Sequence, residues 1–157
     1  MTEISKYVQA SKDMSATHFR AASAIESHCE FLNSSEPQNA PEHSAMYISS
    51  AMLRAFSIEL SLKSLISLDS TQIPREHDLH KLFQKLGPET QNNLTSIFNS
   101  RLTRNFSEII NEIKDTFVFW RYLPEKLESG IQAQFDTKEL KIIAETLLEF
   151  LDAKINI

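Results

Sequence analysis

The segment SAMYISSAMLRAFSIELSLKSLISL, residues 44–68, constrains the fold most strongly, because its apolar residues recur at helical spacing on more than one side. A surface helix carries one apolar face, whereas a helix that is apolar on several sides is covered by neighbours. The pattern predicts a long central helix. The positions that carry it are Ala45, Ile48, Met52, Leu53, Ala55, Phe56, Leu60, Leu62, Leu65 and Ile66.

Helical spacing continues on both sides of this segment. Residues 4–32 are predicted to form one helix, and NSSEPQNAPEH at 33–43 is predicted to be the longest loop, since it holds two prolines among small polar residues. Two further helical pieces are expected within 89–119. A last helix is expected within 135–155, where Asp136 and Glu139 have the spacing of a capping box.

The sequence contains only two glycines and shows no strand-like alternation, repeat or low-complexity tract. These features predict an all-α fold, an up-and-down bundle of four to five helices. A length of 157 residues suits a single domain, 1–157, with residues 1–10 as a candidate loose N-terminal arm.

The stretch PREHDLHKLFQKLG, residues 74–87, combines charged groups with an amphipathic pattern. Its apolar residues at 79, 82, 83 and 86 predict a short helix, which Asp78 would cap. Gly87 is expected to be a left-handed C′ residue, with Pro88 opening the next helix. Polar residues gather at helix starts for capping alone, so the stretch need not be a catalytic cluster.

Charge and cysteine content narrow the function classes. A formal net charge of −5 argues against general affinity for nucleic acid, although residues 75–121 hold seven basic against six acidic residues. The single cysteine, Cys29, can form no internal disulfide, which favours a cytoplasmic location. We expect neither a signal peptide nor a membrane span, because no long apolar run is present.

Three segments in order, AFSIELSLKSLI, HDLHKLFQKL and FWRYLPE, resemble the signature of HEPN domains, helical modules associated with nucleotides and RNA in bacterial toxin–antitoxin and anti-phage systems. The resemblance covers about residues 45–125. It implies a bundle of four or five helices, commonly paired as a homodimer with a composite cleft between the subunits.

The resemblance also implies a test for catalysis. Many HEPN proteins are metal-independent ribonucleases with an arginine followed four to six residues later by a histidine, late in the domain. Arg121 is the best match for that arginine, but no histidine follows it. Arg75 and His80, with four residues between them, satisfy the spacing in a segment that is more often structural or pocket-lining in the family.

Two interpretations of the histidine segment stay open. In one, His80 takes a proton from an RNA 2′-hydroxyl while Arg75 or Arg121 stabilises charge on the phosphate. In the other, His77 and Asp78 form the helix start and His80 is a partly exposed first-turn residue. The two histidines lack the Glu-His pattern of a hydrolytic zinc site, so no metal or other cofactor is expected.

His77 is also a candidate for an RNA or nucleotide site, and the other candidates have structural alternatives as well. Glu59 and Lys63, four residues apart in an apolar helix, form either a buried ion pair or part of a ligand pocket. Arg121 and Tyr122 can contact a phosphate and a base, while the aromatic residues around them can equally fill the core. Two further arginines, which surface connections often carry, can extend a phosphate-contacting patch: Arg101 and Arg104.

Three functions follow from these observations. The first is a cytoplasmic, homodimeric HEPN-like module that binds RNA, a nucleotide or a partner protein, in a toxin–antitoxin or anti-phage context that the resemblance alone implies. The second is a metal-independent endoribonuclease using the Arg75–His80 pair. The third is a structural interaction module with only weak, salt-sensitive affinity for RNA.

Overall fold

The computed structural model describes residues 2–35, 40–114 and 136–156, with side chains for all of these except 33–35 and 40–44. The described residues form helices and their connections without any strand, which confirms the all-α class. Two predicted site residues, Arg121 and Tyr122, lie outside the described residues. The helices are α1 (Glu3–Ser35), α2 (Ala40–Ser70), α3 (Leu79–Gln84), α4 (Pro88–Arg101), α5 (Phe106–Ile113) and α8 (Thr137–Ile155).

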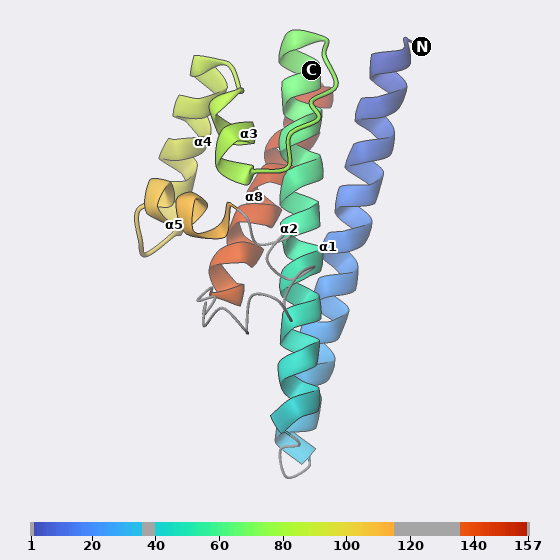
Figure 1. The fold of residues 1–157 in the computed structure, drawn as a ribbon, viewed down its shortest axis with the longest axis vertical. Coiled ribbons are helices and arrows are strands. Elements are labelled where there is room, and N and C mark those ends of the chain that lie inside the picture. The colour runs from blue at the N-terminus through green and yellow to red at the C-terminus, as the bar shows by residue number, and fades with distance from the viewer. Residues whose placement is uncertain (1, 36–39, 115–135, 157) are drawn as a thin grey trace.

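Helices α1 and α2 form a long antiparallel pair (Figure 1). Helices α3, α4 and α5 lie on the side of α2 away from α1, and α8 packs against both α2 and α1. Both extend into the predicted loop 33–43, since α1 ends at Ser35 and α2 begins at Ala40. Pro41 is compatible with this start, because proline is tolerated in the first turn of a helix. Residues 3–10, for which the sequence allowed a loose arm, form the first turns of α1.

Small side chains line the contact between α1 and α2. Ser15 donates to the backbone oxygen of Ser57 at 2.8 Å, and its Oγ lies 2.8 Å from Oγ of Ser61. All three serines are buried. Since the distance between two helix axes depends on the side chains at the contact, these serines allow α1 and α2 to pack closely.

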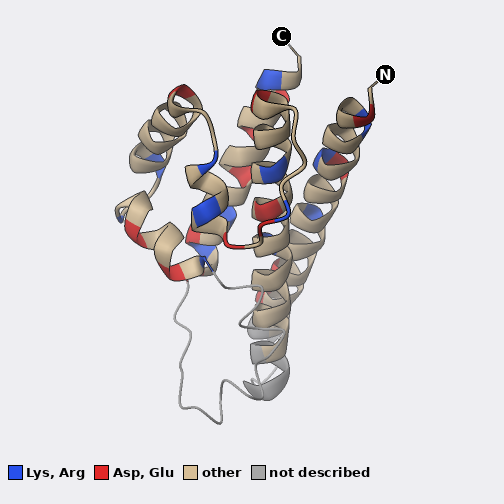
Figure 2. Cartoon of the chain, turned by 45° about the horizontal axis from the view of Figure 1, so that its top comes forward, with Lys and Arg blue, Asp and Glu red and all other residues tan. Residues whose placement is uncertain are grey.

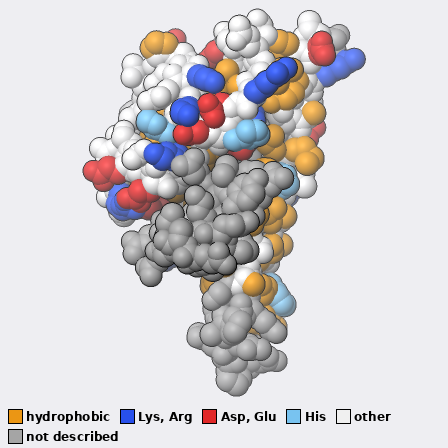
Figure 3. All heavy atoms as spheres, in the orientation of Figure 1, with side chains coloured by type: hydrophobic (Ala, Val, Ile, Leu, Met, Phe, Trp, Pro, Cys, Tyr) orange, Lys and Arg blue, Asp and Glu red, His pale blue; other side chains and the backbone are white. Residues whose placement is uncertain are grey.

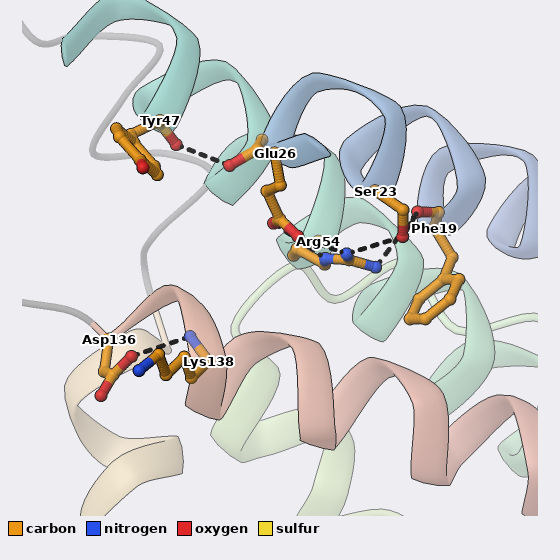
Figure 4. Close-up of polar contacts among 8 residues, drawn as sticks. Phe19, Ser23, Glu26, Tyr47, Arg54, Asp136 and Lys138 are labelled. Carbon is orange, nitrogen blue, oxygen red and sulfur yellow. Dashed lines mark hydrogen bonds and ion pairs between the residues drawn. The ribbon is translucent and has the colours of Figure 1, made fainter. Parts of the chain in front are cut away.

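A fully buried arginine joins the same two helices further along (Figure 4). Arg54 of α2 donates from Nη2 to Oε2 of Glu26 at 2.8 Å and to Oγ of Ser23 at 2.9 Å. Its Nη1 donates to the backbone oxygen of Phe19, and the guanidinium lies 4.2 Å from the centre of the Phe19 ring. These partners offset the cost of burying the charge.

The central position predicted for α2 is confirmed. Residues 61–67 are all buried, because α2 packs against α1, α3 and α8. Next to it, two aromatic contacts hold the shorter helices together: the rings of Phe98 and Phe106 stack at 4.1 Å, and Phe83 meets Phe106 edge-on at 5.0 Å. The core therefore includes residues of α3, α4 and α5 as well as those of α2 and α8.

The helix ends agree with the predicted caps except at two positions. Asp78 accepts from the backbone N–H of Lys81 at 2.9 Å, as expected. Gly87 has φ −58° and ψ 148°, so the predicted left-handed C′ residue is wrong. Residues 82–86 close α3 with short i→i+3 bonds, and Gly87 can therefore serve directly as the N-cap of α4.

The second difference is at the start of α8. Asp136 accepts from the backbone N–H of Lys138 at 2.8 Å, which confirms the cap (Figure 4). The side chain of Glu139 points instead to Arg104, at 3.3 Å, so the reciprocal half of the predicted capping box is replaced by a contact with another part of the chain.

Candidate functional site

A buried carboxylate in the middle of α2 lies at the centre of the candidate site. Glu59 is only 4% exposed. Its Oε1 accepts a hydrogen bond from Nζ of Lys63 at 2.8 Å and lies 2.9 Å from Nδ1 of His77. Its Oε2 is buried and has no hydrogen-bond partner among the described residues. Since a buried acceptor without a donor costs free energy, Oε2 is the atom of this site that most needs a partner.

Lys63 lies one helical turn from Glu59 and is 7% exposed. The predicted ion pair therefore forms, with both members buried. A buried pair is tolerated only when each charge is compensated, and here a single carboxylate oxygen serves both the ammonium and an imidazole. The pair explains why charged residues can occupy an otherwise apolar helix.

His77 reaches Glu59 because the chain reverses direction after α2. Thr71 has φ 56°, the left-handed conformation, and its N–H donates to the backbone oxygen of Ser67. The hydroxyl of Ser67 then donates to the backbone oxygen of Gln72 at 2.8 Å. This turn sends the chain back along α2, so that two residues 18 positions apart come into contact.

The backbone next to His77 is fixed by a carboxylate. Oε1 of Glu76 accepts from the N–H groups of Asp78, at 3.2 Å, and His77, at 3.0 Å. These two bonds, that from Asp78 first, lower the pKa of Glu76. The N–H of Leu79 donates to the backbone oxygen of Lys114, which ties the start of α3 to the end of α5. His77 is thus presented on a constrained segment, although its side chain is 58% exposed.

Arg75 and His80, the predicted catalytic pair, are not part of the cluster around Glu59. Arg75 is exposed on the segment before α3. His80 is half-buried in the first turn of α3, with its Nε2 3.3 Å from Nε2 of Gln84. The residues that the fold brings together are Glu59, Lys63 and His77, while Arg75 and His80 flank His77 in the sequence.

Basic groups and histidines gather on the face that covers α3 and the connection before it, with acidic groups among them (Figure 3). Figure 2 shows basic positions on α3 and acidic ones on the connection leading to it. Besides Arg75, the exposed basic side chains of this region include Lys81 and Lys85. The face therefore has mixed charge, and one of these cations, Lys81, lies 3.9 Å from the carboxylate of Asp78.

The two arginines predicted to extend a phosphate patch face carboxylates of the chain itself. Arg101 binds Glu149 at 2.7 Å, and Arg104 binds Glu112 at 2.5 Å and Glu139 at 3.3 Å. The bond to Glu112 raises the pKa of Arg104. Burial raises the pKa of Glu139 against the opposing attraction of Arg104. Arg101 thus joins the end of α4 to α8, and Arg104, on the connection after α4, joins α5 to α8.

Two contacts in the described region were not predicted from the sequence. The contact between Glu59 and His77 depends on the reversal at Thr71, and no local pattern signals it. The Arg54–Glu26 pair could have been suspected, because Arg54 interrupts an apolar helix as Glu59 and Lys63 do. Within the parts described, no group of three or more His, Cys, Asp or Glu side chains is arranged to hold a metal ion, and no helix has the length and apolarity of a bilayer span.

Comparison with known families decides the classification. The sequence matches the HEPN domain family over residues 39–155, well over half of the chain. The chain belongs to the HEPN domain family. The comparisons matched no curated protein and no solved structure.

As an HEPN domain, the chain is a helical module of a class associated with nucleotides and RNA. The match includes Glu59, Lys63 and His77 and excludes α1, which precedes residue 39. In this HEPN chain, α1 nevertheless covers α2 along its length through the buried serines and Arg54. The candidate site thus lies inside the matched part, and α1 supports α2 from outside it.

Proposed function

We propose that this HEPN domain binds RNA or a nucleotide at the face formed by α2, the connection before α3, and α3 itself. The observation that carries the proposal is Oε2 of Glu59, a buried acceptor without a donor among the described residues. The N–H groups of a nucleobase are donors of the right kind, and single-stranded RNA exposes them.

Charges around Glu59 support the choice of ligand. Arg75, Lys81 and Lys85 provide exposed cations within about ten residues of His77 in the sequence, where phosphates can be neutralised. The chain as a whole carries a net charge of −5, so binding is restricted to this face and depends on salt. Arg121 and Tyr122 are proposed as further contacts, for a phosphate and a base.

The test is the affinity of a fluorescent single-stranded RNA, measured by anisotropy at several salt concentrations. Arg75→Ala and Lys81→Ala should each weaken binding and reduce the dependence on salt by about one ion. Lys138→Ala is the matched control, because it removes one exposed charge at the start of α8, outside the proposed face. Equal effects of all three substitutions would contradict the proposal.

Glu59 needs a separate test, because its proposed role is to accept a hydrogen bond from the ligand, whereas Arg75 and Lys81 neutralise phosphate charge. Glu59→Gln keeps the shape of the side chain but removes the carboxylate, and we expect about tenfold weaker binding of RNA. Circular dichroism checks that helical content is unchanged. Wild-type affinity in a folded Glu59→Gln protein would show that this carboxylate does not contact the ligand.

Three further proposals concern the setting of the domain. We propose a homodimer, which light scattering tests, and a partner protein in a toxin–antitoxin or anti-phage system, which purification with the product of a neighbouring gene tests. A cytoplasmic location agrees with the buried, unpaired thiol of Cys29. A folded protein that binds neither RNA nor nucleotides would favour the structural interaction module instead.

The endoribonuclease assignment with Arg75 and His80 stays a proposal as well. Exposure of Arg75 and partial exposure of His80 are compatible with contact to RNA. Cleavage in EDTA that is lost in both Arg75→Ala and His80→Ala would support this pair. The histidine that contacts Glu59 is a different one, His77.

A further inference from the structure

Helix α1 carries two rows of residues at coiled-coil spacing, and only one of them faces α2. The inner seam includes Val8, Ser15, Ala22 and Cys29, which recur every seven residues and are all buried where α1 packs on α2. The outer seam begins one residue earlier, about 100° around the helix. Its residues follow one another at alternating steps of three and four: Tyr7, Ala10, Met14, Thr17, Ala21, Ala24, His28 and Phe31.

The outer seam has the composition of a contact between helices, but it is exposed. None of its eight residues is Asp, Glu, Lys or Arg; six are exposed and the other two are half-buried. Met14 is 50% and Phe31 65% exposed. Figure 3 shows hydrophobic side chains with histidines among them along the side of the molecule where α1 lies. Heptad spacing held over more than three heptads is typical of a helix that packs against another helix, so this face predicts a further partner helix.

Helix α8 does not serve as that partner. It packs against the α1–α2 pair from the other side, where Lys12 of α1 forms an ion pair with Asp152. Successive residues of a helix are about 100° apart, so Lys12 points away from Ala10 and Met14, its neighbours on the outer seam. The outer seam is therefore on the side of α1 opposite α8.

The sizes of the outer-seam residues are complementary to the same seam read in reverse. When two copies of α1 run antiparallel with Thr17 level with Ala21, small residues meet large ones along the seam. The layers are then Thr17 with Ala21, Met14 with Ala24, Ala10 with His28, and Tyr7 with Phe31, and the two-fold axis repeats each of them. Facing large and small residues interdigitate without voids. A parallel pair would instead place each alanine against an alanine and Met14 against Met14.

We infer that the outer seam is the contact between two copies of this chain, formed by antiparallel α1 helices. The inference rests on the homodimer proposed above and adds its interface, direction and register. Residues 7–31 precede the family match at 39–155, so this interface does not follow from membership of the family. The seam is about 36 Å long, and covering about half of the circumference of each helix removes roughly 1,100 Å² of surface, enough for a specific interface.

Antiparallel pairing also suits the shape of the chain. Figure 1 shows that the α1–α2 pair extends beyond α3, α4, α5 and α8 at the end where α1 stops and α2 begins. In the dimer this projecting end lies beside the first half of α1 of the other copy, around which the rest of the bundle is packed. Arg20, exposed next to the outer seam and close to the axis, faces its own counterpart. Arg20→Ser should therefore strengthen the dimer.

Sedimentation of the full chain tests the interface. Wild type should have the mass of two chains at micromolar concentration. Met14→Asp should weaken association at least about tenfold, because the contact then buries a charge without a partner. Ile73→Asp is the matched control, since Ile73 is an apolar side chain of similar exposure, 45%, on the connection before α3, and this variant should stay dimeric. Circular dichroism checks that both variants keep their helical content.

Cysteine cross-linking tests direction and register without disturbing the seam. In a Cys29→Ala background, the double variant Ala10→Cys/His28→Cys should form a covalent dimer on oxidation, because these two positions share a layer. Each single variant should stay uncross-linked, since its two cysteines lie about 27 Å apart in the antiparallel dimer, far beyond the reach of a disulfide.

The outcomes separate this interface from the proposals above. A monomeric wild type overturns the interface together with the homodimer. A dimer that Met14→Asp leaves intact, or that Ile73→Asp weakens equally, overturns the assignment to α1 and leaves the homodimer. Cross-links in both single variants indicate parallel helices and overturn the register. RNA affinity enters none of these measurements, so failure of the interface leaves the proposed RNA binding untouched.

Discussion

Oε1 of Glu59 and Nδ1 of His77 lie 2.9 Å apart, although 18 positions separate the two residues in the sequence. Their contact joins the buried middle of α2 to an exposed segment before α3. The carboxylate is therefore held in the core while the imidazole faces solvent. The buried carboxylate thus orients the exposed imidazole.

The buried pair within α2 should dominate local stability. Lys63→Met leaves the carboxylate of Glu59 buried without its ammonium, and breaking such a pair costs about 3–5 kcal/mol of the free energy of unfolding. Urea titration measures this loss. Replacing both partners together, as in Glu59→Leu with Lys63→Met, should recover most of it, and a double variant as unstable as Lys63→Met would contradict the account.

Arg54 should be the most sensitive charged residue between α1 and α2. Arg54→Met strands the carboxylate of Glu26 and the backbone oxygen of Phe19, so we expect a loss of about 3–5 kcal/mol. Arg101→Met is the control, since its pair with Glu149 is exposed and should cost less than about 1 kcal/mol. Similar losses in the two variants, measured by thermal or urea unfolding, would show that the buried network contributes little.

The reversal after α2 should be strained at one residue. Thr71 is β-branched and left-handed, a conformation that costs an L-residue about 1–2 kcal/mol and glycine almost nothing. Thr71→Gly should therefore raise the free energy of unfolding by up to about 1 kcal/mol, after the greater freedom of glycine in the unfolded chain is counted. Ser70→Gly, one residue earlier at the end of α2, should lower it instead.

Acid should weaken the bundle where α2, α4 and α8 meet. Burial acts to raise the pKa of Asp69, but hydrogen bonding and attraction from Lys154, with further bonds from Thr90 and Gly87, outweigh it and lower that pKa. A carboxyl with a lowered native pKa stabilises the fold fully above its unfolded pKa and loses this contribution as pH falls through the native value.

Unfolding of wild type and Asp69→Asn in urea between pH 7 and pH 3 tests this sign. Wild type should lose more stability than the variant over the acidic part of the range, and the gap between the two proteins should close as pH falls. A gap that stays constant with pH would mean that ionisation of Asp69 does not contribute to stability.

Local patterns were sufficient for most of the fold. The apolar spacing of residues 44–68 predicted a central helix, and α2 is buried on the sides facing α1, α3 and α8. Asp78 and Asp136 cap helices as predicted, and capping depends only on neighbouring residues. The prediction for Gly87 was wrong because a glycine at this position can either end α3 in a left-handed conformation or act as the N-cap of α4. The packing of α3 and α4 also determines which of the two the chain adopts.

The site was less predictable, because its decisive contact is not local. The i, i+4 spacing predicted the pair of Glu59 with Lys63. That His77 rather than His80 meets the carboxylate depends on a reversal at Thr71, a residue type that rarely adopts a left-handed conformation. Arg101 and Arg104 were predicted to be available for a phosphate. Their carboxylate partners Glu149 and Glu139 come from a distant segment of the chain, so the sequence around the arginines does not reveal them.

The most direct test of the central claim is to map where RNA binds. Amide ¹H–¹⁵N spectra of the labelled protein are recorded as an uncleavable 2′-O-methyl RNA is added. The account predicts that the largest shifts fall on residues 75–85 and on the turn of α2 around Glu59, with little change at the start of α8. Shifts centred elsewhere, or no shifts at RNA concentrations far above that of the protein, would contradict it.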